Sequence, residues 1–325
     1  MPDSKAGPST LKLAGLVFAW YAGNTFYNIF NKKATNGLHA HWTVASLQLI
    51  VGIACSLLMW GTGIRKVPNL SAADIAACIP IGLFACLAHC GSVLSAAVGE
   101  VSFSQIVKAC EPVFAAVVGV VVPPMDLKPM LAYAMLIPIV GGVGLACVKE
   151  GKGVSINVES FLWASMANAA AALKGKLGSS VTKSLQTDKT KNMDAANVYA
   201  VMNIISFCCT MPFVVINELP TLGKTWAEAT AKSGAADIWT NIFLSGLCFY
   251  FYNEFAFAFT AQVGAVTSSV LNTAKRVIII VASSIVFKEA MERNTVIGSA
   301  IAIGGTFAYS LASPHHAPKA KDKKA

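Results

Sequence analysis

Charged residues are scarce in this sequence. Only 13% of its 325 residues are Asp, Glu, Lys or Arg, whereas soluble domains contain about 25%. Acidic residues are the scarcer kind, with 16 Asp and Glu beside 25 Lys and Arg, and hydrophobic residues make up 55% of the chain. This composition excludes a water-soluble globular protein. It predicts an integral membrane protein with the lipid bilayer as its surroundings and no nucleic acid among its partners.

The motifs of common enzymes are also missing. The sequence has no glycine-rich nucleotide loop, no Ser/His/Asp arrangement in a soluble segment, and no connector long enough for a soluble catalytic domain. Its nine cysteines lie in apolar stretches without metal-ligand spacing, so we interpret them as small core residues. We therefore expect no cofactor, no metal site and no enzymatic activity.

Long apolar segments fill most of the chain. A bilayer core of roughly 30 Å needs about 20 apolar residues per helix, and this spacing predicts an all-α protein with ten membrane-crossing helices. The ten segments are Leu11 to Phe30, Trp42 to Trp60, Ala73 to Val98, Val101 to Val122, Leu127 to Val148, Ser160 to Leu185, Ala196 to Ile216, Ile238 to Ala261, Gly264 to Phe287 and Val296 to Leu311. The longest connector, Asn217 to Asp237, is polar.

The two halves of the chain resemble each other weakly. The stretch VSFSQIVKACEPVFAAVVGVVV, from Val101, is similar to VTSSVLNTAKRVIIIVASSIVF, from Val266, and a Gly-Gly pair lies in the segment after each. Because each half holds an odd number of segments, two such halves have opposite orientations in the membrane. We expect a polar tail over 1–10, a first repeat over 11–148 within the first five to six helices (11–185), a second repeat over 160–312, and a basic tail over 313–325.

Five basic residues lie well inside the predicted membrane segments, away from their ends. They are Lys108, Lys174, Lys176, Lys275 and Arg276. A cation near the bilayer centre costs roughly 2.5 to 3.5 kcal/mol on insertion scales, so it usually has a function or faces a watery cavity. The helices supply two acids, Glu111 and Glu254, with Glu100 near an end, and two acids do not neutralise five bases. The excess predicts an anionic ligand, and a phosphate ester fits because it carries about −1.5 to −2 charge and three acceptor oxygens.

Five stretches of the sequence resemble one known family. They are AWYAGNTFYNIFNKK in the first segment, VSFSQIVKACEP in the fourth, MDAANVYA before the seventh, YNEFAFAF in the eighth and LNTAKRV in the ninth. In this order they are similar to the plastidic phosphate translocators of the drug/metabolite transporter superfamily. The resemblance implies a ten-helix transporter that exchanges inorganic phosphate for a phosphorylated small metabolite across a plastid membrane by alternating access. A three-carbon metabolite, triose phosphate or 3-phosphoglycerate, is the substrate that we expect first.

The resemblance also implies a set of site residues. Lys108, Lys275 and Arg276 match the phosphate-binding cations of the family, and Tyr252 matches the tyrosine that contacts the organic part of the substrate. Ser92 and His89 match a hydroxyl residue and a histidine that line the same cavity. For His89, a buried histidine that donates to a backbone carbonyl is the alternative interpretation.

Two motifs depart from the family pattern. The stretch FSQIVK, with Gln105, stands where the family has FTHTIK. In the sixth segment LKGKLGSSVTK replaces a basic run, so Lys174, Lys176 and Lys183 compete for one role. We favour Lys176 because it is deeper in the predicted segment than Lys183, for which a solvated helix end is the simpler interpretation.

Several alternatives remain at this stage. They are a hexose-phosphate or phosphoenolpyruvate exchanger, a nucleotide-sugar transporter of the same superfamily and, from another class, a membrane enzyme acting on a phosphorylated lipid. The resemblance implies a plastid envelope membrane. The lead PDSKAGPST is too short for a transit peptide, and the end KDKKA, with Lys321 and Lys323, fits a dilysine pattern. That pattern suits the outermost membrane of a complex plastid, continuous with the endoplasmic reticulum. We expect a monomer or a weak dimer.

Overall fold

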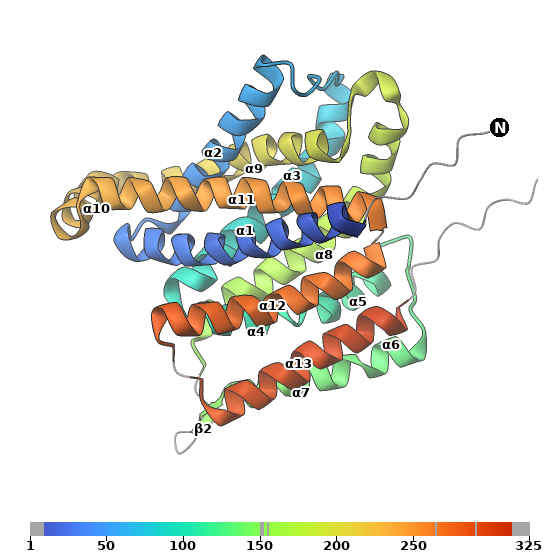
Figure 1. Cartoon of the computed structure of the whole chain (residues 1–325), viewed down its shortest axis with the longest axis vertical. Coiled ribbons are helices and arrows are strands. Elements are labelled where there is room, and N and C mark those ends of the chain that lie inside the picture. Colours follow the sequence, from blue (N-terminus) through green and yellow to red (C-terminus); the bar gives the residue numbers. More distant parts are fainter. Residues whose placement is uncertain (1–9, 150–152, 155, 264, 290, 314–325) are drawn as a thin grey trace, which may run out of the picture.

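The computed structural model of the chain (Figure 1) describes residues 10–149, 153–154, 156–263, 265–289 and 291–313. The polar tail up to residue 9 and the basic tail from residue 314, with Lys321 and Lys323, lie outside the described residues.

The described residues are almost entirely helical. The first half contains α1 (Thr10–Gly37), α2 (His41–Gly61), α3 (Ala72–Val98), α4 (Val101–Lys108), α5 (Glu111–Val121), α6 (Met130–Ala134) and α7 (Leu136–Ala146). The second half contains α8 (Val158–Thr187), α9 (Ala195–Asn217), α10 (Leu219–Ser233), α11 (Ala235–Val263), α12 (Ala265–Phe287) and α13 (Arg293–Ala312). A 3-10 turn (Lys189–Lys191) precedes α9, and the short strands β1 (Val148–Lys149) and β2 (Gly153–Val154) pair antiparallel between α7 and α8. The predicted all-α class is confirmed apart from this small pair.

Seven described helical segments are long and apolar enough to cross a membrane. They are His41–Gly61, Ala72–Val98, Val101–Val121, Ala195–Asn217, Ala235–Thr260, Thr267–Phe287 and Arg293–Ala312. Met130–Ala146 is apolar but shorter. The remaining long helices, α1 and α8, have 28 and 30 residues but are less apolar. Ten spans in two repeats therefore stay a prediction, because three of the predicted segments do not combine length with apolarity.

The connector Asn217 to Asp237 differs from its expected polar loop, because it forms the helix α10. Leu222 and Trp226 pack against a buried cluster to which Ala229 belongs, and the Trp226 ring lies 5.5 Å from that of Trp239. Apolar residues three or four positions apart share one helix face, but they are few in this segment, so its polar composition concealed the helix.

The helices form one bundle in which sequence-distant segments lie side by side. Figure 1 shows α1 along α11 and, at one edge, α13 along α7, and both pairs are in contact. The α7–α13 crossing is close because of two glycines. A Cβ atom on Gly298 would lie 2.4 Å from the carbonyl oxygen of Gly142, and one on Gly142 would lie 2.6 Å from that of Gly298. Small residues permit such close approach between membrane helices.

One end of the bundle is fastened at the turn between α3 and α4. The Lys32 ammonium of α1 donates to three carbonyl oxygens, those of residues 96, 97 and 99, at 2.8, 3.0 and 2.8 Å. The Glu289 carboxylate, just after α12, accepts from the backbone N–H groups of residues 101 and 102 at 2.9 and 3.0 Å. A cation at a helix C-terminus and an anion at a helix N-terminus both complement the helix dipole. We call Lys32, Glu289 and the 96–102 turn the α3–α4 latch.

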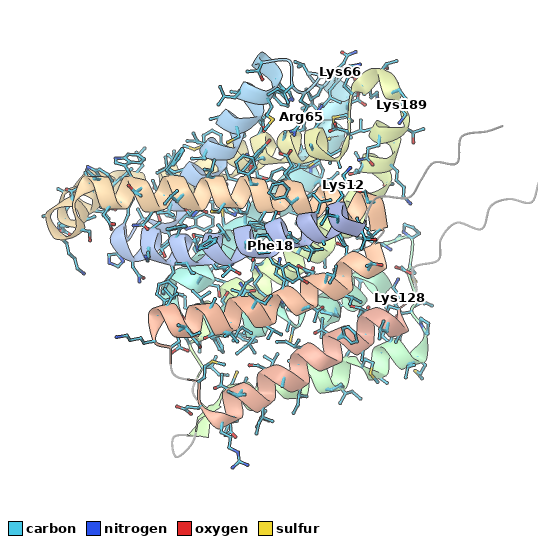
Figure 2. All side chains as sticks on the ribbon, in the orientation of Figure 1. Lys12, Phe18, Arg65, Lys66, Lys128 and Lys189 are labelled. Carbon is cyan, nitrogen blue, oxygen red and sulfur yellow. The ribbon has the colours of Figure 1, made fainter. Side chains whose placement is uncertain are left out.

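The outer surface carries large apolar side chains. Phe18 on α1 is 76% exposed and points away from the bundle in Figure 2, and Leu162 and Ile285 are also exposed. The labelled basic residues Lys12, Lys66, Lys128 and Lys189 lie toward the end of the bundle that holds both described termini. An apolar circumference is what a bilayer requires, whereas in water it would favour aggregation.

Candidate functional site

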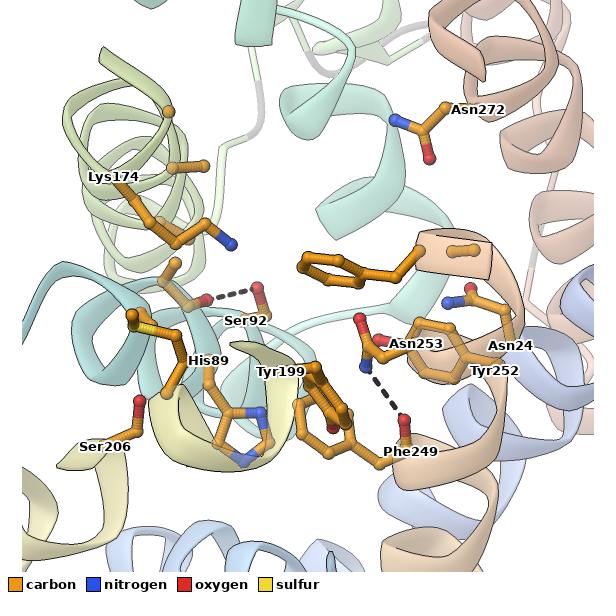
Figure 3. A pocket seen from close by; sticks show the side chains of 18 of the residues that line it. Asn24, His89, Ser92, Lys174, Tyr199, Ser206, Phe249, Tyr252, Asn253 and Asn272 are labelled. Carbon is orange, nitrogen blue, oxygen red and sulfur yellow. Dashed lines mark hydrogen bonds between the residues drawn. The ribbon is translucent and has the colours of Figure 1, made fainter. Parts of the chain in front are cut away.

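A cavity of about 730 Å³ lies inside the bundle, lined by residues from α1, α2, α3, α4, α5, α8, α9, α11 and α12. On α9 and α11 the lining residues belong to the half of the helix nearer the described termini, at the right of Figure 1. The α3–α4 latch fastens the opposite end. Figure 3 shows polar side chains pointing into this space from several helices, among them Lys174, Asn272 and Asn24.

A break between α4 and α5 brings two charged residues into the cavity. Lys108 is the last residue of α4, and Glu111 is the first of α5. Each charge complements the dipole of its own helix end. The carbonyl oxygens exposed by the break are satisfied from elsewhere: Asn168 donates to that of residue 107 at 3.0 Å, and Thr306 to that of residue 109 at 2.9 Å. Interrupted helices beside a cavity are a recurring construction of transporter sites.

The Lys108 ammonium has a neutral partner. It donates to the Ser92 hydroxyl at 2.8 Å, and that hydroxyl donates to the carbonyl oxygen of Ala88 at 2.7 Å. Lys108 and Ser92, which the resemblance implied for the site, both line the cavity. Because Ser92 adds no negative charge, the positive charge of Lys108 remains available to an anion.

Arg276 forms an ion pair across the two halves of the chain. Its Nη2 lies 2.6 Å from Glu111 Oε2, and its Nε has no hydrogen-bond partner among the described residues. The Arg276 side chain is 6% exposed, whereas that of Glu111 is 41% exposed within the cavity. Part of the guanidinium donor capacity is therefore unused.

Lys275 lies against aromatic rings. Its ammonium is 5.2 Å from the ring centre of Trp20 and 5.6 Å from that of Tyr252. Tyr252 packs in turn against Tyr27 and Phe249, which places it beside the cavity as expected for the tyrosine of the family. Cation–π contact favours the ammonium but leaves its charge uncancelled.

Of the three lysines in the sixth predicted segment, the one that we favoured, Lys176, does not line the cavity. Lys174 lines the cavity, and the exposed Lys183 lies at its edge. Lys176 is outside the lining and donates to the carbonyl oxygen of Pro124 at 2.5 Å. Residues two apart differ by about 200° around a helix, so α8 turns Lys174 inward and Lys176 away. Lys174, and not the favoured Lys176, therefore lines the cavity.

His89 and Gln105 line the cavity in hydrogen-bonded positions. His89 Nε2 lies 3.2 Å from the carbonyl oxygen of Ala45, which makes Nε2 the donor, and the ring is buried beside Phe249. Both interpretations of His89 therefore apply together: the residue lines the cavity and also donates to a backbone carbonyl oxygen. Gln105 donates to Asn28 Oδ1 at 3.1 Å, so it joins a polar network with α1.

Several asparagines that the sequence analysis did not predict as site residues line the cavity. Asn24, Asn28 and Asn31 lie on one face of α1, and all three line the cavity together with Asn253 and Asn272. Their spacing of four and three residues is the signal of a shared helix face. It was available in the sequence, because three asparagines on one side of a membrane helix have no place in lipid.

The charge balance is more positive than the sequence suggested. Glu254 does not line the cavity, because its carboxylate pairs with Arg65 at 2.5 Å. Within the described residues, five cationic side chains line the cavity against one carboxylate, that of Glu111. The cations are Lys108, Lys174, Lys183, Lys275 and Arg276. Such a cavity attracts small anions that carry more than one charge.

Comparison with known families assigns the chain. Residues 11–310 match the triose-phosphate transporter family. The chain belongs to this family. As a family of transporters, it accounts for the membrane-length helices and for the cavity within the bundle.

Several relatives are about one-third identical to this transporter. A non-green plastid triose phosphate/phosphate translocator of Brassica oleracea var. botrytis is 32% identical and is aligned over 91% of this chain and 72% of the relative. For the phosphoenolpyruvate/phosphate translocator 1 of Arabidopsis thaliana the values are 31%, 91% and 71%. For the xylulose 5-phosphate/phosphate translocator of the same plant they are 32%, 94% and 71%. The three names share phosphate and differ in the organic part.

A solved crystal structure of a protein at 14% identity resembles the fold. The TM-score is 0.53, and the match covers 94% of this chain and 98% of that chain. The likeness concerns the arrangement of the helices alone.

Proposed function

We propose that this transporter is a secondary antiporter that exchanges inorganic phosphate for a phosphorylated three-carbon metabolite, triose phosphate or 3-phosphoglycerate. The observation that carries the proposal is the cavity itself, in which five cations face one carboxylate among the residues that the structure describes. Lys108, Lys275 and Arg276 would hold the phosphate group, because a planar fork and two point charges together satisfy its three oxygens. Tyr252, Ser92 and His89 would face the organic part.

The charge excess gives a physical reason for strict exchange. When phosphate occupies the cavity, its charge offsets the repulsion among the cations, and the helices around it can close. When the cavity is empty, closure would bury several unpaired cations, each at a cost of roughly 2.5 to 3.5 kcal/mol. The empty carrier therefore stays open to one side of the membrane until a substrate binds, and it changes the side of access only with substrate bound.

The wider assignment follows from the same proposal. The chain would be a multi-pass protein of a plastid envelope membrane, as the names of its relatives suggest, with ten helices arranged as two inverted five-helix repeats. The outermost membrane of a complex plastid is the alternative location. We propose a carrier without enzymatic activity, working as a monomer or a weak dimer on phosphate and phosphorylated small metabolites.

Other phosphorylated substrates compete with the three-carbon assignment. Relatives at similar identity are named for phosphoenolpyruvate and for xylulose 5-phosphate, and the cavity of about 730 Å³ has an amide-rich lining that suits hydroxylated compounds. A hexose phosphate or a nucleotide sugar is the remaining alternative.

Transport assays in liposomes test the proposal. Purified protein is reconstituted, and uptake of radiolabelled phosphate is compared between phosphate-loaded and empty vesicles. We expect uptake to require internal phosphate; equal rates in both vesicles would refute strict exchange. Loading the vesicles with dihydroxyacetone phosphate, 3-phosphoglycerate, glucose 6-phosphate, phosphoenolpyruvate or uridine monophosphate then ranks the counter-substrates. Fastest exchange with a three-carbon ester supports the assignment, and preference for uridine monophosphate would identify a nucleotide-sugar carrier.

A further inference from the structure

Glu111 stands apart from the other ionisable residues of the cavity. It is the single carboxylate among the described lining residues, and it pairs with Arg276 across the two halves of the chain. Its side chain is 41% exposed to the cavity, whereas the Arg276 side chain is 6% exposed. Glu111 is therefore the accessible partner of the pair, and Arg276 is the buried one.

Glu111 shares the cavity with further cations besides Arg276. Lys108, Lys174 and Lys275 line the same cavity. A single carboxylate thus faces the same cations that would face a bound phosphate. Its place at the first position of the eleven-residue helix α5 favours the negative charge through the helix dipole.

Arg276 can exchange Glu111 for another anion as its hydrogen-bond partner. Glu111 holds Arg276 through one short contact, between Oε2 and Nη2, and Arg276 Nε has no partner among the described residues. A guanidinium binds a phosphate best through two parallel N–H donors. Phosphate therefore gains from the donors of Arg276 most fully when Glu111 withdraws from it.

We propose that Glu111 is a resident counter-anion that competes with the transported phosphate group for Arg276 and thereby promotes its release. The inference rests on the proposed phosphate exchange and concerns the cycle at the same site. Phosphate binding displaces Glu111 from Arg276; when the carrier opens, Glu111 pairs with Arg276 again and the phosphate leaves. A transported ion must bind well enough to enter and weakly enough to leave, and five cations without a competing acid would hold a divalent anion too long.

The decisive variant is Glu111→Gln, which keeps the shape of the side chain and removes its charge. We expect the KM for phosphate in phosphate/phosphate exchange to fall about tenfold and the maximal exchange rate to fall by a similar factor, because binding tightens and release slows. Glu254→Gln is the matched control. It also removes the acid from an ion pair with a sequence-distant arginine, Arg65, but Glu254 lies outside the cavity lining and its replacement should leave the KM for phosphate unchanged.

A second variant and a second measurement keep the test valid if Glu111→Gln folds poorly. Glu111→Asp retains the charge but shortens the side chain by one methylene, so we expect a smaller fall in KM in the same direction. In detergent, phosphate should raise the melting temperature of either variant more than that of the wild type.

The possible results are distinct. A higher KM in both variants would mean that Glu111 orients Arg276 for phosphate, and an unchanged KM with a lower melting temperature would mean a structural pair; each overturns the inference. Wild-type protein that exchanges no phosphate would instead refute the proposed function, whatever the variants do.

Discussion

Replacing Lys275 by methionine should separate function from stability. The Lys275 ammonium contacts the rings of Trp20 and Tyr252. Methionine keeps the length of the side chain and removes the charge. A charge-assisted hydrogen bond is worth about 1.5 to 3 kcal/mol, so phosphate affinity should fall about 10- to 150-fold. The empty protein loses a cation that costs about 2.5 to 3.5 kcal/mol together with cation–π contacts that return about 0.5 to 2 kcal/mol. It should therefore become more stable by about 0.5 to 3 kcal/mol.

Two measurements on one preparation test this expectation. Phosphate exchange in liposomes should be lost or strongly reduced in Lys275→Met, while the melting temperature without phosphate should be at least that of the wild type. Arg276→Met is the comparison, because it leaves the Glu111 carboxylate without its partner and should lose both exchange and stability. The reasoning fails if Lys275→Met melts well below the wild type, which would make Lys275 a structural residue. It also fails if exchange stays within threefold of the wild type.

Three further perturbations have expected outcomes. Lys174→Gln reduces the positive excess in the cavity, so uptake of phosphate into empty liposomes should rise relative to exchange; Lys176→Gln, outside the lining, should keep the wild-type ratio. Gly298→Val forces a side chain against Gly142 at the α7–α13 crossing and should lower stability by about 1 to 3 kcal/mol, seen as a lower melting temperature. Glu289→Ala leaves two N–H groups of α4 unpaired. Amide hydrogen exchange at residues 101–108 should become faster in this variant, while that of α9 is unchanged. Exchange at 101–108 as slow as in the wild type would argue against the latch.

The helical segments were predictable because they depend on local composition. Long apolar runs can satisfy their backbone in a bilayer only as helices, so their positions follow from the sequence. The break at Ala109 and Cys110 was not predictable in the same way. Pro112, in the first turn of α5, is a local signal of a helix start, but the exposed carbonyl oxygens of the break are satisfied by Asn168 and Thr306 from distant helices. Tertiary partners of this kind leave no local signal.

The charged site was partly predictable. An excess of cations over acids can be counted from the sequence, and Lys108, Lys275 and Arg276 do converge on one cavity. The inward face of α8 could not be derived, because the alanine-rich stretch ANAAAALKGK gives almost no contrast between faces. Glu254 pairs with Arg65, 189 residues away in the sequence, and so does not neutralise the cations of the cavity. Pairings at such distance are decided by the fold.

The α3–α4 latch has a consequence for how this region tolerates sequence change. Lys32 and Glu289 both bind main-chain atoms, carbonyl oxygens on one side and N–H groups on the other. These hydrogen bonds therefore place no demand of their own on the side chains at positions 96–102, except that proline at 101 or 102 has no N–H group to donate. Packing limits these positions separately, because Ala96, Val101 and Ser102 are buried and a Cβ atom on Gly99 would lie 2.4 Å from the Ser160 hydroxyl oxygen. A substitution at Lys32 or Glu289 removes the donor or the acceptor itself. The latch contacts should therefore be more sensitive to mutation at these two residues than to a change of side chain in the turn.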